Sequence, residues 1–95
     1  MLTSKERASL RSMANTLQPV LQIGKGGISE NLLKQLDEVL EARELVKITV
    51  LETAELDAKE TAEVLCRELR AEPVQTLGRK VTLFRRNYDE PKIKF

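Results

Sequence analysis

The sequence contains no histidine, no tryptophan and only one cysteine among its 95 residues. Without histidine it lacks the side chain best suited to proton transfer near neutral pH, which is also the commonest metal ligand. One cysteine forms neither a disulfide framework nor, without histidine, a zinc site. We therefore expect no metal, no cofactor and no catalysis. Cys66 lies among apolar positions at helical spacing, so we expect a buried and inert thiol.

Long apolar segments are also missing. No run approaches the roughly 20 residues that a membrane span needs. The opening residues, MLTSKERASL, contain no long apolar stretch of the kind found in secretory signals. With no disulfide framework, these features favour a reducing cytoplasm. The length suits one domain over residues 1–95 with one modest core.

An excess of charge of either sign is absent too. The chain has 16 Lys and Arg residues against 15 Asp and Glu residues, for a net charge of +1. This excludes a generic polycation, so any nucleic-acid binding must come from bases and acids that are segregated in space. The sequence does segregate them, because acids crowd residues 30–63, whereas residues 78–86 contain four bases and no acid.

Local patterns predict three helices. Thr3 and Glu6 form a capping box at the start of the first helix. Asp57 and Glu60 repeat this pattern for the third helix, and Ser29 can cap the second. After each cap, apolar residues recur at helical spacing with charges on the opposite face.

Four strands are predicted between and after these helices, at residues 20–23, 45–51, 74–77 and 81–86. Pro19 separates the first helix from the first strand, and Pro73 ends the segment of the third helix. Residues 78–80 form a hairpin turn between the last two strands. The order α-β-α-β-α-β-β predicts one compact α/β (α+β) domain with a mixed sheet. We expect a loose polar tail over residues 87–95.

The residue pattern of the second predicted strand indicates that one face of the sheet is apolar and the other is half polar. Val46, Ile48 and Val50 alternate with Lys47 and Thr49. This pattern is expected when helices cover mainly one face of the sheet. On the pattern alone, Lys47 is either a solvated edge lysine or a functional one.

The segment QIGKGGIS, residues 22–29, raises the question of what its three glycines in four positions do. A P-loop needs a glycine where Pro19 stands and a Ser or Thr where Gly26 stands, so that motif fails. The dinucleotide-binding fingerprint needs a third glycine where Ser29 stands, so it fails too.

What remains is a G-x-x-G loop, Gly24 to Gly27, between a strand and a helix. Its glycines let a phosphate backbone approach closely, the helix start offers N–H groups, and Lys25 adds positive charge. The alternative is a turn whose glycines only supply positive φ.

The order of these segments resembles the YhbY family, the single-domain bacterial form of the CRM domain (chloroplast RNA splicing and ribosome maturation). The resemblance rests on LTSKERASLRSMANTLQPVLQIGKGG, ELVKITVL, LDAKETAEVL and VQTLGRKVTLFRR, which span nearly the whole chain in family order. It implies a four-stranded mixed sheet with three helices, similar to the C-terminal domain of bacterial initiation factor three. It also implies RNA binding and an association with precursors of the large ribosomal subunit.

The resemblance further implies a set of RNA-binding residues: Gly24, Lys25, Gly26, Gly27, Lys47, Arg79, Lys80, Arg85 and Arg86. Phe84 stands where the family often has an aromatic beside the arginines of the last strand. Arg85 and Arg86 are neighbours on a strand, so only one of them can share a face with Lys47. We expect the lysines and several of the hairpin bases to cluster on one surface, with the acids of the second and third helices elsewhere.

Aromatic residues are scarce, which limits how RNA can be read. Phe84, Tyr88 and Phe95 are the only ones, and they provide no platform for stacking unpaired bases. Recognition of phosphates and of the shape of folded RNA remains.

Three functions are therefore open to a protein with this sequence. The leading hypothesis is a monomeric, non-catalytic RNA-binding protein that acts in ribosome assembly and needs neither a membrane nor a small-molecule substrate. The alternative is an adapter that contacts a ribosomal protein or an assembly factor. A small nucleotide-handling enzyme is disfavoured by the missing histidine and the failed phosphate motifs.

Overall fold

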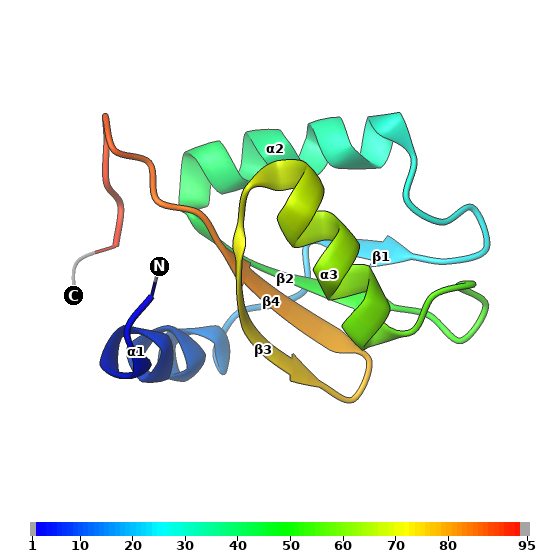
Figure 1. The fold of residues 1–95 in the computed structure, drawn as a ribbon, viewed down its shortest axis with the longest axis horizontal. Helices are drawn as coiled ribbons and strands as arrows, with labels where there is room; N and C mark the ends of the chain where they lie inside the picture. The colour runs from blue at the N-terminus through cyan, green and yellow to red at the C-terminus, as the bar shows by residue number, and fades with distance from the viewer. Residues whose placement is uncertain (1, 94–95) are drawn as a thin grey trace.

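Residues 2–93 form three helices and four strands in the predicted order, as described by a computed structural model (Figure 1). The elements are α1 (Ser4–Ala14), β1 (Leu21–Ile23), α2 (Glu30–Arg43), β2 (Leu45–Val50), α3 (Ala58–Leu69), β3 (Glu72–Leu77) and β4 (Lys80–Phe84). The strands form one sheet in the order β1-β2-β4-β3, in which β1 is parallel to β2 and the other neighbouring pairs are antiparallel. The predicted fold class is confirmed.

The helices begin where the capping patterns place them. Thr3 Oγ1 accepts a hydrogen bond from the N–H of Glu6 at 3.1 Å, and the Glu6 carboxylate accepts one from the N–H of Thr3 at 3.0 Å. Asp57 and Glu60 make the same reciprocal pair at 2.8 and 3.2 Å. The Ser29 hydroxyl accepts a hydrogen bond from the backbone N–H of Leu32 at 3.1 Å. Each cap satisfies N–H groups that a helix start leaves without partners.

The first helix is shorter than its apolar spacing suggests. It ends at Ala14, although apolar spacing continues to Leu17. Thr16 donates both its backbone N–H and its hydroxyl to the carbonyl oxygen of Met13, at 3.3 and 3.0 Å. A short polar side chain that bonds to nearby backbone in this way competes with the helical ladder.

The third strand includes Pro73, where the sequence predicted only the end of a helical segment. Helix α3 already ends at Leu69, because Arg70 adopts a left-handed conformation with φ 55°. Pro73 lacks an N–H, but β3 is an edge strand, where proline is tolerated. The pairing with β4 shifts register between Pro73 and Gln75, which forms a bulge.

The two faces of the sheet carry different helices. Figure 1 shows α2 and α3 on one side of the sheet and α1 on the other. The main core on the α2 and α3 side includes Ile23, Leu36, Leu40, Val46, Ile48, Val50, Leu65, Val81 and Leu83. A second cluster packs α1 against the opposite face and contains Leu2, Leu10, Ala14, Leu45, Val74 and Phe84. Helix α1 covers only the end of the sheet where β2 begins and β4 ends.

The segment 87–93 has neither helix nor strand, but its backbone is anchored. The anchor is Glu44, which follows α2 at φ 66° and whose side chain is 0% exposed. The carboxylate accepts hydrogen bonds from the N–H groups of Asn87 (2.7 Å), Lys92 (2.6 Å) and Ile93 (2.7 Å) and from the guanidinium of Arg86 (3.4 Å). This differs from the loose tail expected for residues 87–95, of which residues 94 and 95 lie outside the described part of the chain. The cause is a buried carboxylate distant in sequence, which no local pattern reveals.

None of the helices within residues 2–93 combines the length and the apolar character that a bilayer crossing requires.

Candidate nucleic-acid interface

The glycine-rich loop is a tight turn between β1 and α2. The N–H of Gly27 donates to the carbonyl oxygen of Gly24 at 2.9 Å, which places Lys25 and Gly26 at the exposed tip of the turn. Helix α2 begins at Glu30, directly after the loop, so the positive end of its dipole lies beside the turn. Backbone, lysine and helix start therefore combine into a surface that an anion can approach.

The three glycines of this loop are glycines for different reasons. Gly27 has φ +68°, a conformation that favours glycine. A Cβ on Gly24 would come within 3.3 Å of side-chain atoms of Leu51 and Thr53. Gly26 has neither constraint, since its φ is not in the left-handed region and a Cβ would meet no described atom within 4 Å. The two alternatives left open by the sequence, a turn that needs positive φ and a loop that leaves room for a phosphate backbone, thus apply to different residues. Gly27 fits the first, and Gly26, which the fold does not require to be glycine, fits the second.

An open, polar area occupies the part of the sheet that α1 does not cover. The pairing of β2 with β4 places Lys47 opposite Thr82 and Thr49 opposite Lys80, and Gln22 of β1 pairs with Thr49. These side chains alternate with those of the main core, so they project on the face opposite α2 and α3. We call Gln22, Lys47, Thr49, Lys80 and Thr82 the open sheet face, although Thr82 itself is only 3% exposed. Lys47 is on β2, which neighbours β1, the strand that leads into the glycine-rich loop, and Lys80 is one strand further away on β4.

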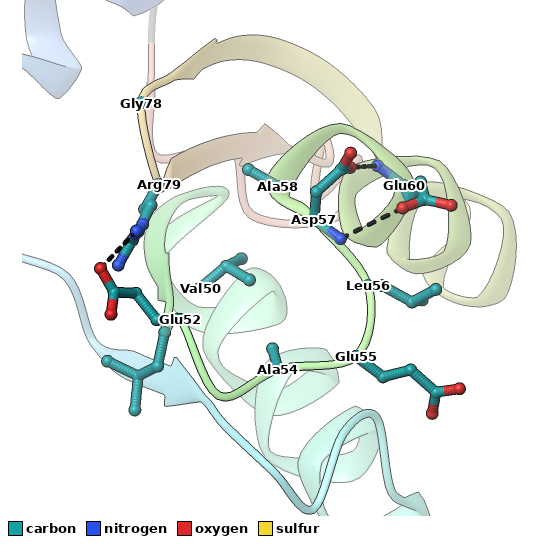
Figure 2. A pocket seen from close by; sticks show the side chains of 11 residues that line it. Val50, Glu52, Ala54, Glu55, Leu56, Asp57, Ala58, Glu60, Gly78 and Arg79 are labelled. Atoms are coloured by element: carbon teal, nitrogen blue, oxygen red, sulfur yellow. Dashed lines mark hydrogen bonds and ion pairs between the residues drawn. The ribbon is translucent and has the colours of Figure 1, made fainter.

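Arg79 lies at the edge of this area, but the charged groups around its side chain are carboxylates. Its guanidinium is 2.6 Å from the carboxylate of Glu52, and the two side chains are 56% and 74% exposed. A pair as exposed as this is worth roughly 0–1 kcal/mol, so it can open. Figure 2 shows the pair at the rim of a pocket of about 330 Å³ that is also lined by Glu55, Asp57 and Glu60. These carboxylates repel phosphate and limit a nucleic-acid surface on this side.

Arg85 does not join the open sheet face. Its N–H donates to the carbonyl oxygen of Glu44, so it lies near the beginning of β2, at the opposite end from Lys80. The guanidinium turns to the α2 side, where it bonds to the carboxylates of Asp37 at 2.7 Å and Glu41 at 3.3 Å. It also donates to the carbonyl oxygen of Leu69 at 3.0 Å. Arg85 thereby ties α2 and α3 to the end of β4.

Arg86 is held at the same end of the molecule. Its guanidinium donates to the buried carboxylate of Glu44 at 3.4 Å and to the carbonyl oxygen of Ile93 at 2.6 Å, and it lies 5.4 Å from the centre of the Phe84 ring. Of the bases expected to cluster, Lys47 and Lys80 share the open sheet face, and Lys25 lies on the loop that follows β1. Arg85 and Arg86 follow the end of β4 at Phe84 and lie elsewhere. An RNA-binding role for Arg85 and Arg86 stays a prediction.

Helix α1 contributes bases that the sequence reasoning did not single out. Lys5, Arg7 and Arg11 lie on this helix, which has one acid, and the helix packs on the same face of the sheet as Lys47. Arg7 donates from Nε to the carbonyl oxygen of Pro73 at 3.3 Å. The imbalance of three bases to one acid in α1 was the available signal, since α2 has four acids and two bases.

Cys66 is half-buried rather than fully buried. Burial, with a contribution from the negative charge of Glu72, raises the pKa of its thiol to about 11. A thiol with this pKa stays protonated at neutral pH and is a poor nucleophile, as expected for an inert cysteine.

The chain is similar to known proteins over nearly its whole length. The family model of the CRS1/YhbY (CRM) domain matches residues 2–85. A protein of Bacillus subtilis named "Probable RNA-binding protein YqeI" is 43% identical over 94 residues, which cover 99% of this chain and 98% of that protein. A protein of Haemophilus influenzae named "RNA-binding protein" is 30% identical over 93 residues, covering 98% and 93% of the two chains.

A solved structure has the same fold. It is the solution structure of SAV1595 from Staphylococcus aureus, described as a hypothetical protein and a candidate for RNA binding. The two chains are 45% identical, with a TM-score of 0.78 and coverage of 100% of this chain and 95% of the other. From the order of its elements, its glycine-rich loop and these similarities, the chain belongs to the CRS1/YhbY (CRM) domain family.

Proposed function

We propose that this protein binds structured RNA through its glycine-rich loop and open sheet face, without chemistry of its own. The observation that carries the proposal is the exposed tip of the loop, where Gly26 has no structural need to be glycine and Lys25 lies beside it. A missing side chain at such a position leaves room for a phosphate backbone to approach the turn. The names of the relatives from Bacillus subtilis and Haemophilus influenzae support RNA as the ligand.

Charge placement defines the path that the RNA backbone follows. Lys25 at the loop and the lysines of the open sheet face, Lys47 and Lys80, offer positive charge on one side. The acidic pocket beside Arg79 bounds that side. RNA therefore passes from the outer side of the turn across the open sheet face, away from the acids.

The RNA we propose is that of precursor large ribosomal subunits, bound in the cytoplasm during assembly. The support is the resemblance to stand-alone bacterial members of the family. Ribosomal precursors offer folded RNA whose phosphates and 2′-hydroxyls are accessible, and this suits a surface without exposed aromatic rings. In the described residues Phe84 is only 2% exposed, and Tyr88, which is 89% exposed, lies in the tail and not on the loop or the open sheet face.

Two substitutions at the loop test the RNA-binding proposal. Lys25→Ala removes one phosphate contact, so affinity for an RNA hairpin should fall at any sequence, and the log–log salt slope should shrink by about 1 or less. Gly26→Asp places a carboxylate where phosphate approaches, so its affinity should fall further. Lys34 is an exposed lysine on α2, so Lys34→Ala is the matched control and should bind as the wild type does.

Fluorescence anisotropy at two salt concentrations measures the affinities, and melting temperatures report folding. Unchanged affinity in a folded Lys25→Ala, Gly26→Asp double variant would refute the proposed role of the loop.

The ribosomal part of the proposal has its own test. The purified protein is mixed with precursor large subunits or with mature large subunits and sedimented through a sucrose gradient. We expect it to sediment with the precursors and to be depleted from the mature particles. Equal binding to both particles would contradict a role in assembly, while leaving RNA binding itself intact.

A further inference from the structure

A second concave site lies on the α1 side of the sheet. It is a groove of about 350 Å³ between the end of α1, the connection to β1, the beginning of β2 and the tail. Met13, Leu17 and Ile93 give it an apolar wall; Met13 is 36% exposed, and the other two are half-buried. The wall is too small to mark a binding surface by itself, so the polar and charged groups around it decide what the groove can hold.

The groove is positively charged, in contrast to the pocket beside Arg79. Arg43 and Lys47 line it, and no described Asp or Glu does. Among residues 2–93, neither cation has an ion-pair partner. The exposed amide side chain of Gln18 also reaches the groove. Apolar wall, amide and two available cations therefore converge at one place.

We propose that this groove holds one unpaired nucleotide of the bound RNA. Its base lies against the wall formed by Met13 and Leu17, the Gln18 amide contacts the edge of the base, and the flanking phosphates lie at Arg43 and Lys47. A base has flat, weakly polar faces, polar edges and a charged phosphate nearby, which matches these three kinds of group. Methionine is flexible and polarizable, so it can cover a planar ring without an aromatic partner. The inference rests on the proposed function, because it specifies how the same RNA is read.

The position of the groove lets one RNA contact both sites. Val20 lies in the groove, and Ile23 precedes the glycine-rich loop. The strand β1, which joins the groove to the loop, has three residues and spans about 10 Å. Lys47 belongs both to the groove and to the open sheet face. A folded RNA that presents its backbone to the loop can therefore place a nearby bulged nucleotide in the groove.

The test compares two fluorescein-labelled RNA hairpins with the same stem. One is fully paired, and the other has a single-nucleotide bulge. We expect the wild-type protein to bind the bulged hairpin up to about tenfold more tightly, which is near the upper end of what a methionine sulfur gains against an aromatic ring. Met13→Glu places a carboxylate in the groove and should remove this preference. Met13→Gln is the neutral match in size and should keep most of it.

A control separates the groove from general electrostatics. Ser12→Glu adds the same charge at the neighbouring exposed position of α1, which does not line the groove. It should lower the affinity for both hairpins by the same small factor and leave the preference intact. Gln18→Ala lies outside the helix, so it tests the groove even if Met13→Glu unfolds the protein. It should reduce discrimination among different bulged bases.

The outcomes distinguish this inference from the function on which it rests. If the wild type binds both hairpins equally, or if Met13→Glu and Ser12→Glu weaken both hairpins alike, the groove does not hold a nucleotide, while RNA binding stands. If neither hairpin binds, the proposed function fails and the inference fails with it. If Met13→Glu instead dissociates a dimer seen by analytical ultracentrifugation, the occupant is a second copy of the chain, and the inference is overturned.

Discussion

Gly26 and Gly27 are neighbours with opposite expected responses to alanine. Gly27 has φ +68°, so Gly27→Ala should lower the free energy of unfolding by about 1 kcal/mol. Gly26 has no such strain and no atom close to a Cβ, so Gly26→Ala should leave stability unchanged or raise it by about 0.5 kcal/mol. Urea unfolding of the two variants measures both values. Equal losses would show that the whole turn, and not one residue, requires glycine.

The lowered pKa of Glu44 predicts that the free energy of unfolding decreases at acid pH. Burial alone would raise the pKa of its carboxyl, but the hydrogen bonds from the N–H groups of Asn87, Ile93 and Lys92 and the charge of Arg86 outweigh burial, so the pKa lies below the ordinary value of 4.5. A group whose pKa is lower in the folded state stabilises the fold above its unfolded pKa, and this stabilisation is lost as pH falls through the folded pKa. The wild type should therefore lose this contribution below about pH 4.5.

Glu44→Gln isolates this contribution from that of the other acids. The amide keeps the shape but offers one acceptor oxygen where the carboxylate has two, and it removes the negative charge that the Arg86 guanidinium contacts. We expect a loss of about 3 kcal/mol at neutral pH and a weaker dependence on pH between about pH 6 and pH 3. Urea unfolding at several pH values measures both. Parallel pH curves for the two proteins would contradict the role assigned to Glu44.

At the scale of elements, Arg85 and Lys47 should have opposite effects. Arg85→Ala removes the bonds that join β4 to α2 and α3, so the free energy of unfolding should fall by about 1–2 kcal/mol, since the carboxylate partners are exposed. Its RNA affinity should stay within about twofold of the wild type. Lys47→Ala should do the reverse, with near-normal stability and weaker RNA binding. A folded Arg85→Ala protein that binds RNA as poorly as Lys47→Ala would instead place Arg85 at the interface.

Features that depend on neighbouring residues could be predicted from the sequence, and features that depend on distant segments could not. The helix starts at Thr3 and Asp57 could be predicted because a capping box is complete within four residues. Pro73 could not be placed in a strand, because the tolerance for proline depends on the position of β3 at the sheet edge. Among the site residues, the face on which Lys47 lies followed from strand alternation, whereas Lys80 was expected in the hairpin turn and instead begins β4. The ion pairs of Arg85 involve α2, 44 to 48 residues earlier in the chain. Contacts between distant segments are decided by packing, which a local pattern does not contain.

At the scale of the whole molecule, RNA binding should depend on salt only moderately. The net charge is +1, and the proposed surface includes Lys25, Lys47 and Lys80. About three phosphate contacts predict a slope of log K against log salt between about −2 and −3. Anisotropy titrations from low to physiological salt measure this slope, with Arg85→Ala as a variant that should not change it. A slope near zero would favour an adapter that uses apolar contacts.

The two edge strands of the sheet limit aggregation between molecules. Strand β1 has only three residues, and β3 has Pro73, a bulge, and a carbonyl oxygen that accepts a hydrogen bond from Arg7. A strand from another molecule would find few free ladder groups at either border, and such blunted borders resist edge-to-edge aggregation. Copies at high local concentration should therefore resist joining their sheets into fibrils.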